Sequence, residues 1–291
     1  MVLVELAVGD AYGAGFEYSP PEFVSAHNTL VGYVQHPTHL GLSPGDYTDD
    51  TQMTIAIAEM LLSDTTWSRE NLAEKFVRVF HRDQRDGYST GFQALLRASD
   101  TGQQLLAGLT PGSDRSGAAM RTTPIGLLPT IDDVLHHAQL QARVTHDSLA
   151  GVESAQAAAL AVHYCYHQLG TTSAVAVWID QQLRPLGGQE QWSQPWIGKV
   201  GAKGVMSVRA ALGALTHSRS LSELLRTCIA YTGDVDTVAT IALAAGSCAI
   251  DITQDLPHQL YDKLENGPYG HDYLAQLNAQ LAKRYPARTA I

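Results

Sequence analysis

Two short acidic segments, far apart in the sequence, carry the side chains best suited to bind metal ions. Residues 45–51 read Gly-Asp-Tyr-Thr-Asp-Asp-Thr, and residues 232–237 read Thr-Gly-Asp-Val-Asp-Thr. Carboxylate and hydroxyl oxygens are the ligands that Mg²⁺, Mn²⁺ and Ca²⁺ prefer in proteins. Each segment precedes an apolar stretch with helical periodicity, so we expect both to lie where a loop enters a buried helix.

Either segment alone has a simpler explanation as a helix N-terminus. Ser, Thr and Asp are preferred N-cap residues, and acids in the first turn are stabilised by the helix dipole. Asp234 and Asp236 would diverge by about 200° on a regular helix, so they converge only if they straddle the loop–helix junction. Together the two clusters favour a metal site, because four crowded carboxylates repel strongly without cations.

Three further segments contain residues that suit ligand binding. Residues 112–121 read Gly-Ser-Asp-Arg-Ser-Gly-Ala-Ala-Met-Arg, and small residues allow backbone N–H groups to approach an anion closely. An ordinary flexible loop is the alternative, and the absence of a Gly-Lys-Ser or Gly-Lys-Thr sequence disfavours a nucleoside triphosphatase. Residues 9–17 form a Gly-rich turn that ends in an acid, and Thr145-His146 precedes a long apolar stretch.

The elements that must position these residues are predicted to be helices. The chain has 291 residues, of which 45% are hydrophobic, and strand signals are nearly absent. With no linker and no repeat of fixed period, residues 1–291 are expected to form a single all-α domain. Apolar periodicity and capping residues predict helices over residues 50–62, 67–81, 131–144, 151–169, 172–183, 205–215, 221–230, 235–250, 256–265 and 271–284. The main loops are expected over residues 20–47, 110–123 and 187–197.

Composition excludes some classes of function. The net charge is −10 and no basic run is longer than Lys283-Arg284, which argues against sequence-independent nucleic-acid binding. No apolar stretch is long enough to span a membrane, and the N-terminus lacks the features of a secretory signal. Three cysteines without a Cys-x-x-Cys pair are expected to be free thiols, as in a cytoplasmic protein.

In this order along the chain, the five segments resemble the motifs of the ADP-ribosylglycohydrolase family, which includes dinitrogen-reductase-activating glycohydrolases and ADP-ribosylhydrolases. That family has a GDAxGxxxE opening, a (W/Y)TDDTxM motif, an xGAAMRxxPxG loop, a (T/S)H segment and a GGDTDTxA motif. This sequence has matching residues at 9–17, 47–53, 117–126, 145–146 and 233–239. The matches extend over most of the chain, and their joint pattern is highly specific.

The resemblance implies a compact orthogonal helical bundle with a binuclear Mg²⁺ or Mn²⁺ centre in a central ADP-ribose cleft. Glu17 and Asp49 would be the catalytic acid–base candidates. The ligands of the two divalent cations would be Thr48, Asp49, Asp50, Asp234, Asp236 and Thr237. The substrate-binding residues would be Ser113, Asp114, Arg115, Ser116, Gly117, Ala118 and Ala119, which cradle the diphosphate or distal ribose, and His146.

The expected activity is hydrolysis of the glycosidic bond between ADP-ribose and an acceptor, most simply a modified protein side chain, with arginine favoured over serine. The alternatives are a non-catalytic ADP-ribose-binding relative, a hydrolase of ADP-ribosylated nucleic acid or of a small molecule, and a two-metal hydrolase of phosphoesters. Ser116, Thr232 and Val235 depart from the family's usual Asn, Gly and Thr. These departures leave the proposed ligands intact but do not indicate which linkage is cleaved.

Aromatic residues in the loops leave two interpretations open. Trp192 and Trp196 could stack on an adenine or could fill gaps between helices. Tyr88, next to Gly87, could line the cleft or pack within its loop.

Overall fold

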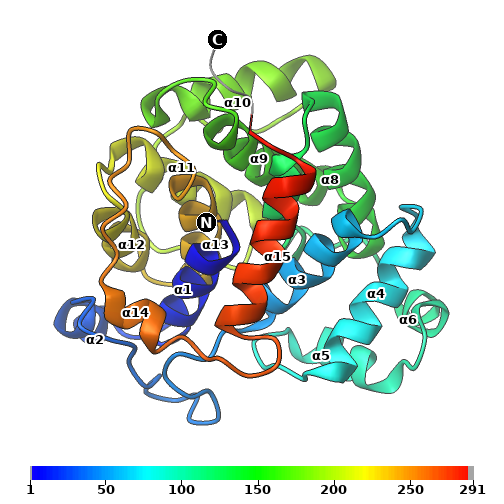
Figure 1. Ribbon diagram of the computed structural model, residues 1–291, viewed down its shortest axis with the longest axis horizontal. Coiled ribbons are helices and arrows are strands. Elements are labelled where there is room, and N and C mark those ends of the chain that lie inside the picture. The colour runs from blue at the N-terminus through cyan, green and yellow to red at the C-terminus, as the bar shows by residue number, and fades with distance from the viewer. Residues whose placement is uncertain (1, 288–291) are drawn as a thin grey trace.

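Every regular element of the structure is helical (Figure 1). The computed structural model describes residues 2–287, and in this range the only β-type pairings are isolated bridges between loops. The all-α fold predicted from the sequence is therefore confirmed. Met1 and residues 288–291 of the expected domain lie outside the described residues.

The helices follow one another along the chain, with two long connections over residues 28–48 and 187–203. They are α1 (Val2–Ala14), α2 (Pro21–His27), α3 (Asp49–Leu62), α4 (Arg69–Arg82), α5 (Thr90–Ala98), α6 (Gly102–Gly108), α7 (Gly117–Met120), α8 (Ile131–Thr145), α9 (Leu149–Tyr166), α10 (Val175–Leu183), α11 (Gly204–His217), α12 (Leu221–Ala230), α13 (Val235–Gly246), α14 (His258–Asp262) and α15 (His271–Arg284). Three short 3₁₀ helices are η1 (Thr123–Leu127), η2 (Thr172–Ala174) and η3 (Arg184–Leu186).

Side-chain caps explain where several helices begin. Ser68, Thr130, Ser148 and Ser220 each accept a hydrogen bond from a backbone N–H in the first turn of α4, α8, α9 and α12, respectively. Such caps satisfy N–H groups that have no partner within the helix. These four helices accordingly begin close to the residues that the sequence predicts.

Two buried helices, α1 and α13, cross at the centre of the bundle and are in extensive contact (Figure 1). Every residue of both helices is buried. Small residues let them approach closely: a Cβ at Gly9 would lie 2.7 Å from the carbonyl oxygen of Ala239. One hydrophobic core, which extends from Val2 to Leu281, surrounds this pair.

The structure differs from the predicted elements in several places. Helix α2 and helix α7 lie within the segments that were expected to be loops, and α5 and α6 were not predicted. The helix expected over residues 235–250 ends at Gly246, and the one expected over 256–265 is reduced to α14. Helix α1, which lies outside the ranges predicted above, begins at Val2 and has 13 residues.

Candidate metal centre and active site

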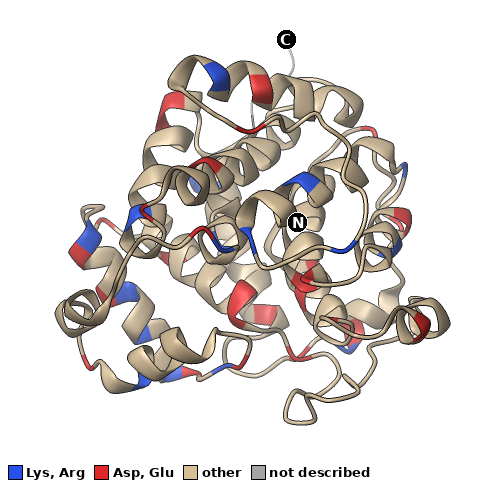
Figure 2. Cartoon of the chain, turned by 180° about the vertical axis from the view of Figure 1, so that it is seen from behind, with Lys and Arg blue, Asp and Glu red and all other residues tan. Residues whose placement is uncertain are grey.

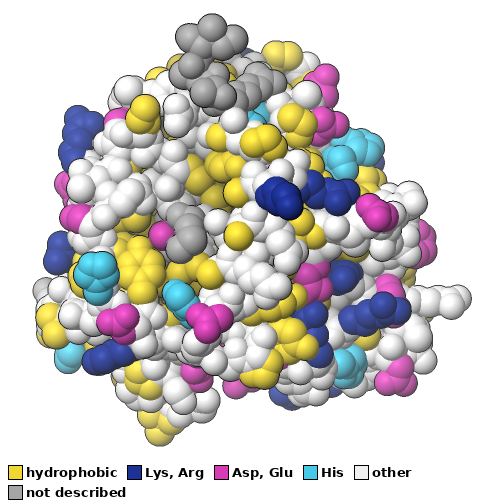
Figure 3. Space-filling model, viewed as in Figure 1, with side chains coloured by type: hydrophobic (Ala, Val, Ile, Leu, Met, Phe, Trp, Pro, Cys, Tyr) yellow, Lys and Arg dark blue, Asp and Glu magenta, His cyan; other side chains and the backbone are white. Residues whose placement is uncertain are grey.

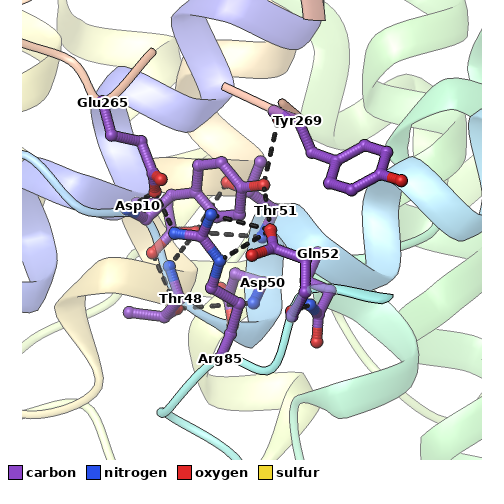
Figure 4. A network of polar contacts seen from close by, with 10 residues as sticks. Asp10, Thr48, Asp50, Thr51, Gln52, Arg85, Glu265 and Tyr269 are labelled. Carbon is purple, nitrogen blue, oxygen red and sulfur yellow. Dashed lines mark hydrogen bonds and ion pairs between the residues drawn. The ribbon is translucent and has the colours of Figure 1, made fainter. Parts of the chain in front are cut away.

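Helix α3 starts at the first acidic segment and is fixed there by a carboxylate from α1. Asp10 is fully buried and accepts hydrogen bonds from the backbone N–H and the hydroxyl of Thr48, at 3.0 and 2.7 Å. It accepts two more from the N–H and hydroxyl of Thr51, at 2.9 and 2.6 Å. Figure 4 shows Asp10 facing both threonines. Asp10 thus holds the N-terminus of α3 against α1.

The loop before α3 is secured from its other side by an ionic network (Figure 4). Arg85 pairs with Asp83 and Glu265, and its guanidinium lies over the ring of Tyr47, 4.1 Å from the centroid. Tyr47 donates a hydrogen bond to the carbonyl of Tyr269 at 3.0 Å. Segments from both halves of the chain therefore fix the position where the first acidic segment enters its helix.

The second acidic segment straddles the start of α13, as convergence of its carboxylates requires. Asp234 is the N-cap residue and Asp236 lies in the first turn. Ser207 of α11 donates a hydrogen bond to Asp234 Oδ2 at 3.0 Å. One carboxylate oxygen from each of Glu17, Asp234 and Asp236 lies within 4.8 Å of the others. This group of three acids could hold a metal ion.

The two acidic segments meet in space. Asp49, Asp50, Asp234, Asp236 and Thr237 all line one cavity of about 480 Å³, together with Glu17. Burial raises the pKa of both Asp50 and Asp234, and a hydrogen bond between each carboxylate and the side chain of Thr237 offsets only part of that rise. The helix starts of α3 and α13 therefore face a common space.

Thr48 takes a different place from the other proposed ligands. Its side chain accepts a hydrogen bond from the N–H of Asp50 and donates one to Asp10. It is buried and is not among the residues that line the cavity. In the structure it is thus the N-cap of α3, with one lone pair left for a ligand role.

The electrostatics of the cluster are those of carboxylates that lack a counter-charge. Burial, together with the charges of Asp234 and Asp10, raises the pKa of Glu17 to about 7. Burial also raises the pKa of Asp234 to about 6, and it holds the pKa values of Asp49 and Asp236 well above their usual range. Several acids that all resist ionisation in one cavity indicate a site for positive charge.

Two carboxylate oxygens of the acidic residues at the cavity show whether a cation would fit there. Asp50 Oδ2 and Asp236 Oδ1 are buried and make no hydrogen bond within residues 2–287. An unpaired buried carboxylate oxygen is costly, and a hard divalent cation is the partner that such oxygens suit. The residues present therefore fit a divalent metal, although its identity and the number of ions stay predictions.

The predicted substrate loop lies partly at the cavity. Ser113, Arg115, Ser116, Gly117 and His146 line it. Asp114 instead forms an exposed ion pair with Lys203 at 2.8 Å, and Ala118 and Ala119 are fully buried in α7. The last three therefore do not line the cavity, and a role in substrate binding would be indirect for them.

Of the aromatic residues left open by the sequence, only Tyr88 reaches the cavity. Its hydroxyl donates a hydrogen bond to Gln52 at 2.5 Å, while its ring lines the wall beside Phe92. Trp192 is buried and Trp196 packs against the core, and neither lines the cavity.

Sequence reasoning assigned no role to Asp10, Ser207 or Arg121. Asp10 is part of the Gly9-Asp10-Ala11 opening of the first family motif, and that motif is the signal that could have singled it out. Ser207 and Arg121 reach the site only because α11 and the segment after α7 pack against it. Such tertiary contacts leave no periodic signal in the sequence.

Comparison with known proteins shows the family to which this chain belongs. The family model of ADP-ribosylglycohydrolase matches residues 2–290. The chain belongs to the ADP-ribosylglycohydrolase family. A solved member, an ADP-ribosylglycohydrolase-related protein complex, shares the fold with a TM-score of 0.74 at 20% identity, over 99% of this chain and 96% of that one.

Named relatives of this ADP-ribosylglycohydrolase-family chain include ADP-ribosylhydrolase ARH3 of Mus musculus, which is 32% identical over 63% of this chain and 53% of that protein. ADP-ribosyl-[dinitrogen reductase] glycohydrolase of Rhodospirillum rubrum is 26% identical over 89% of this chain and 87% of that protein. The matches to ARH3 and to an uncharacterized protein of Archaeoglobus fulgidus span about half the length of those proteins. These matches show the family of the chain, and its activity is a matter for proposal.

Proposed function

We propose that the protein is a metal-dependent hydrolase that cleaves the glycosidic bond between ADP-ribose and an acceptor. The observation that carries this proposal is the meeting of α3 and α13, which brings four aspartates and Glu17 around one cavity. Family membership adds the substrate class. Two divalent cations, Mg²⁺ or Mn²⁺, are the expected cofactors, and the ligands proposed for them are Thr48, Asp49, Asp50, Asp234, Asp236 and Thr237.

Bound cations would supply Lewis-acid activation of a water and binding of the distal ribose hydroxyls. The protein's own part is to accept the proton of that water, and Glu17 and Asp49 are the candidates for this step. Both line the cavity. Glu17 is only partly buried and has a pKa of about 7 without metal, which suits a group that exchanges protons near neutral pH. Ser113, Arg115, Ser116 and Gly117 would bind the diphosphate or the distal ribose, with His146 beside them.

Arginine is proposed as the acceptor in preference to serine, and the charge of the site does not decide between them. Five carboxylates line the cavity, and so do two cationic side chains, Arg115 and Arg121. Two divalent ions would bring four more positive charges, so the ionised site with its metals would be close to neutral. The cationic arginine conjugate and the neutral O-glycoside of serine therefore have to be compared directly.

The test is to offer arginine-linked, serine-linked and nucleic-acid-linked ADP-ribose to the purified protein, with and without a chelator. The proposal predicts release of free ADP-ribose from the arginine conjugate and its loss when metal is removed. Release of phosphate instead would indicate a phosphoester hydrolase. Binding of ADP-ribose without any release would indicate a non-catalytic relative.

A further inference from the structure

A chain of side chains links the buried Arg121 to His146 on the wall of the cavity. Arg121 follows α7 and is fully buried beneath the ring of Phe76. Its Nη2 donates to the hydroxyl of Thr145 at 2.8 Å, and that hydroxyl lies 2.6 Å from His146 Nδ1. We call Arg121, Thr145 and His146 the histidine-orienting triad.

Arg121 has a fixed orientation within this triad. Its Nε donates to Gln141 Oε1 at 2.6 Å, and its Nη2 donates also to the backbone carbonyl of Gln141 at 3.0 Å. Gln141 in turn donates from Nε2 to the carbonyl of Ala118 at 2.9 Å. The guanidinium is therefore held by α8 and α7 together, and it points one N–H at Thr145.

The protons available to Arg121, Thr145 and His146 favour hydrogen on Nε2 of His146. A guanidinium only donates, so the Thr145 oxygen accepts from Arg121 and keeps its single proton for its other partner. If Nδ1 of His146 were protonated, two donors would point at that oxygen and the hydroxyl proton would lack the ring acceptor. With the proton on Nε2, Thr145 donates to Nδ1 and all three groups are satisfied.

The opposite edge of the ring lies beside Gly117. A Cβ at Gly117 would lie 3.0 Å from Cε1 and 3.2 Å from Nε2 of His146. The absence of a side chain at Gly117 therefore leaves Nε2 uncovered, and both residues line the cavity. Burial and the charge of Arg121 lower the pKa of His146 to about 3, which keeps the ring neutral.

We propose that Arg121 and Thr145 are positioning residues that hold His146 as a neutral Nε2–H donor, aimed at an oxygen of the bound ADP-ribose. This inference rests on the proposed function for its ligand, but the orientation of the ring is a property of the free protein. A neutral donor suits a site already rich in charge, because it binds a ribose or phosphate oxygen without adding a cation close to the metal centre.

The matched variants are Thr145→Val, which keeps the shape but removes the hydroxyl, and Thr145→Ser, which keeps the hydroxyl. Two-bond ¹H–¹⁵N spectra of the histidine rings, with His146 assigned by a His146→Asn variant, report the tautomer without any ligand. Wild type and Thr145→Ser should show Nε2 protonated and Nδ1 as an accepting nitrogen. Thr145→Val should show Nδ1 without its hydrogen bond and a mixture of tautomers.

Calorimetric titration with ADP-ribose is the second measurement. Thr145→Val should bind roughly 5- to 10-fold more weakly than wild type, the usual effect of one neutral hydrogen bond, and Thr145→Ser within about twofold. Protonation of Nδ1 in the wild type would overturn the proposal, as would identical spectra and affinities for the two variants. If Thr145→Val does not fold, the spectra of wild type and Thr145→Ser decide the orientation. A wild-type protein with the expected tautomer but no ADP-ribose binding would refute the donor role and the proposed ligand, while the orientation would stand.

Discussion

At the scale of single residues, the buried carboxylate of Asp10 holds the N-terminus of α3 in place. Four donors from Thr48 and Thr51 converge on it, and an amide can accept from only some of them because its NH₂ group donates. Asp10→Asn should lower the free energy of unfolding by about 2 kcal/mol and weaken Mn²⁺ binding about tenfold or more. Urea unfolding and Mn²⁺ calorimetry measure these effects, and an unchanged Mn²⁺ affinity would contradict the assigned role.

Variants of two acids in the cavity should distinguish a residue that binds metal from one that transfers a proton. Asp50 has a buried oxygen without a hydrogen-bond partner, whereas Glu17 is partly exposed at the cavity. Asp50→Asn should therefore reduce Mn²⁺ affinity strongly and abolish turnover at ordinary metal concentration. Glu17→Gln should keep most of the metal affinity and lose about 10²- to 10⁴-fold in kcat, the range for a general base.

Asp49 is the control that identifies the base. Asp49→Ala should bind metal poorly and lose turnover by orders of magnitude. If Glu17→Gln keeps wild-type kcat while Asp49→Asn binds metal and is inactive, the proton acceptor is Asp49. Retained activity in Asp49→Ala would refute its assignment to the site.

At the scale of elements, the contact between α1 and α13 depends on Gly13. A Cβ there would collide with the Cα of Asp236 and lie 2.8 Å from its backbone nitrogen. Gly13→Ala should therefore lower the free energy of unfolding by about 1–3 kcal/mol through overpacking, and it should displace the proposed ligand Asp236. Gly267→Ala is the control, since a Cβ at Gly267 meets nothing within 4 Å. Equal thermal stability and Mn²⁺ affinity in the two variants would contradict this role for Gly13.

The turn before α13 shows how a departure from the family motif is accommodated. Thr232 has a φ of 60° and Gly233 a φ of 94°, in the left-handed region that costs a residue with a side chain about 1–2 kcal/mol. Thr232→Gly should relieve this strain and change stability by at most about 1 kcal/mol, because glycine also loses more entropy on folding. Gly233→Ala should be strongly destabilising, since its Cβ would collide with the carbonyl of Val200. Thermal denaturation compares them, and equal effects would contradict this account.

The helices around the site could be predicted from local sequence signals, but the contacts that join them could not. Periodicity and capping residues locate α3 and α13, and the two-residue spacing of Asp234 and Asp236 requires the junction that the structure has. The pairing of Asp10 with Thr48, and of Asp114 with Lys203, joins residues far apart in the chain. No periodic pattern encodes such contacts, so the sequence alone could not assign them.

At the scale of the whole molecule, charged residues are spread over the surface, and several carboxylates gather in the cavity. Figure 2 shows basic and acidic residues scattered among the helices, and Figure 3 shows them intermixed with apolar patches on one face. No helix among residues 2–287 is long and apolar enough to cross a membrane. The cavity is therefore the place where we expect charge to matter most for function.

The metal-free protein should become less stable as pH rises. Burial raises the pKa of Glu17 to about 7 and of Asp234 to about 6 in the folded state, while unfolded carboxylates titrate near pH 4. Folding therefore takes up protons between about pH 4 and 7. The contribution of these two acids to the free energy of unfolding is fully present below about pH 4 and is lost as the pH rises towards 7. Thermal melts with a chelator measure this trend. In saturating Mn²⁺ the trend should reverse, because the cation favours the ionised carboxylates.

The central claim is that the N-termini of α3 and α13 together hold a pair of divalent cations. Anomalous diffraction from crystals grown with Mn²⁺ and ADP-ribose tests it most directly. The account predicts two peaks in the cavity, close to the carboxylates of Asp49 or Asp50 from α3 and of Asp234 or Asp236 from α13. Crystals that show no peak there, or manganese bound by only one of the two helix starts, would contradict it.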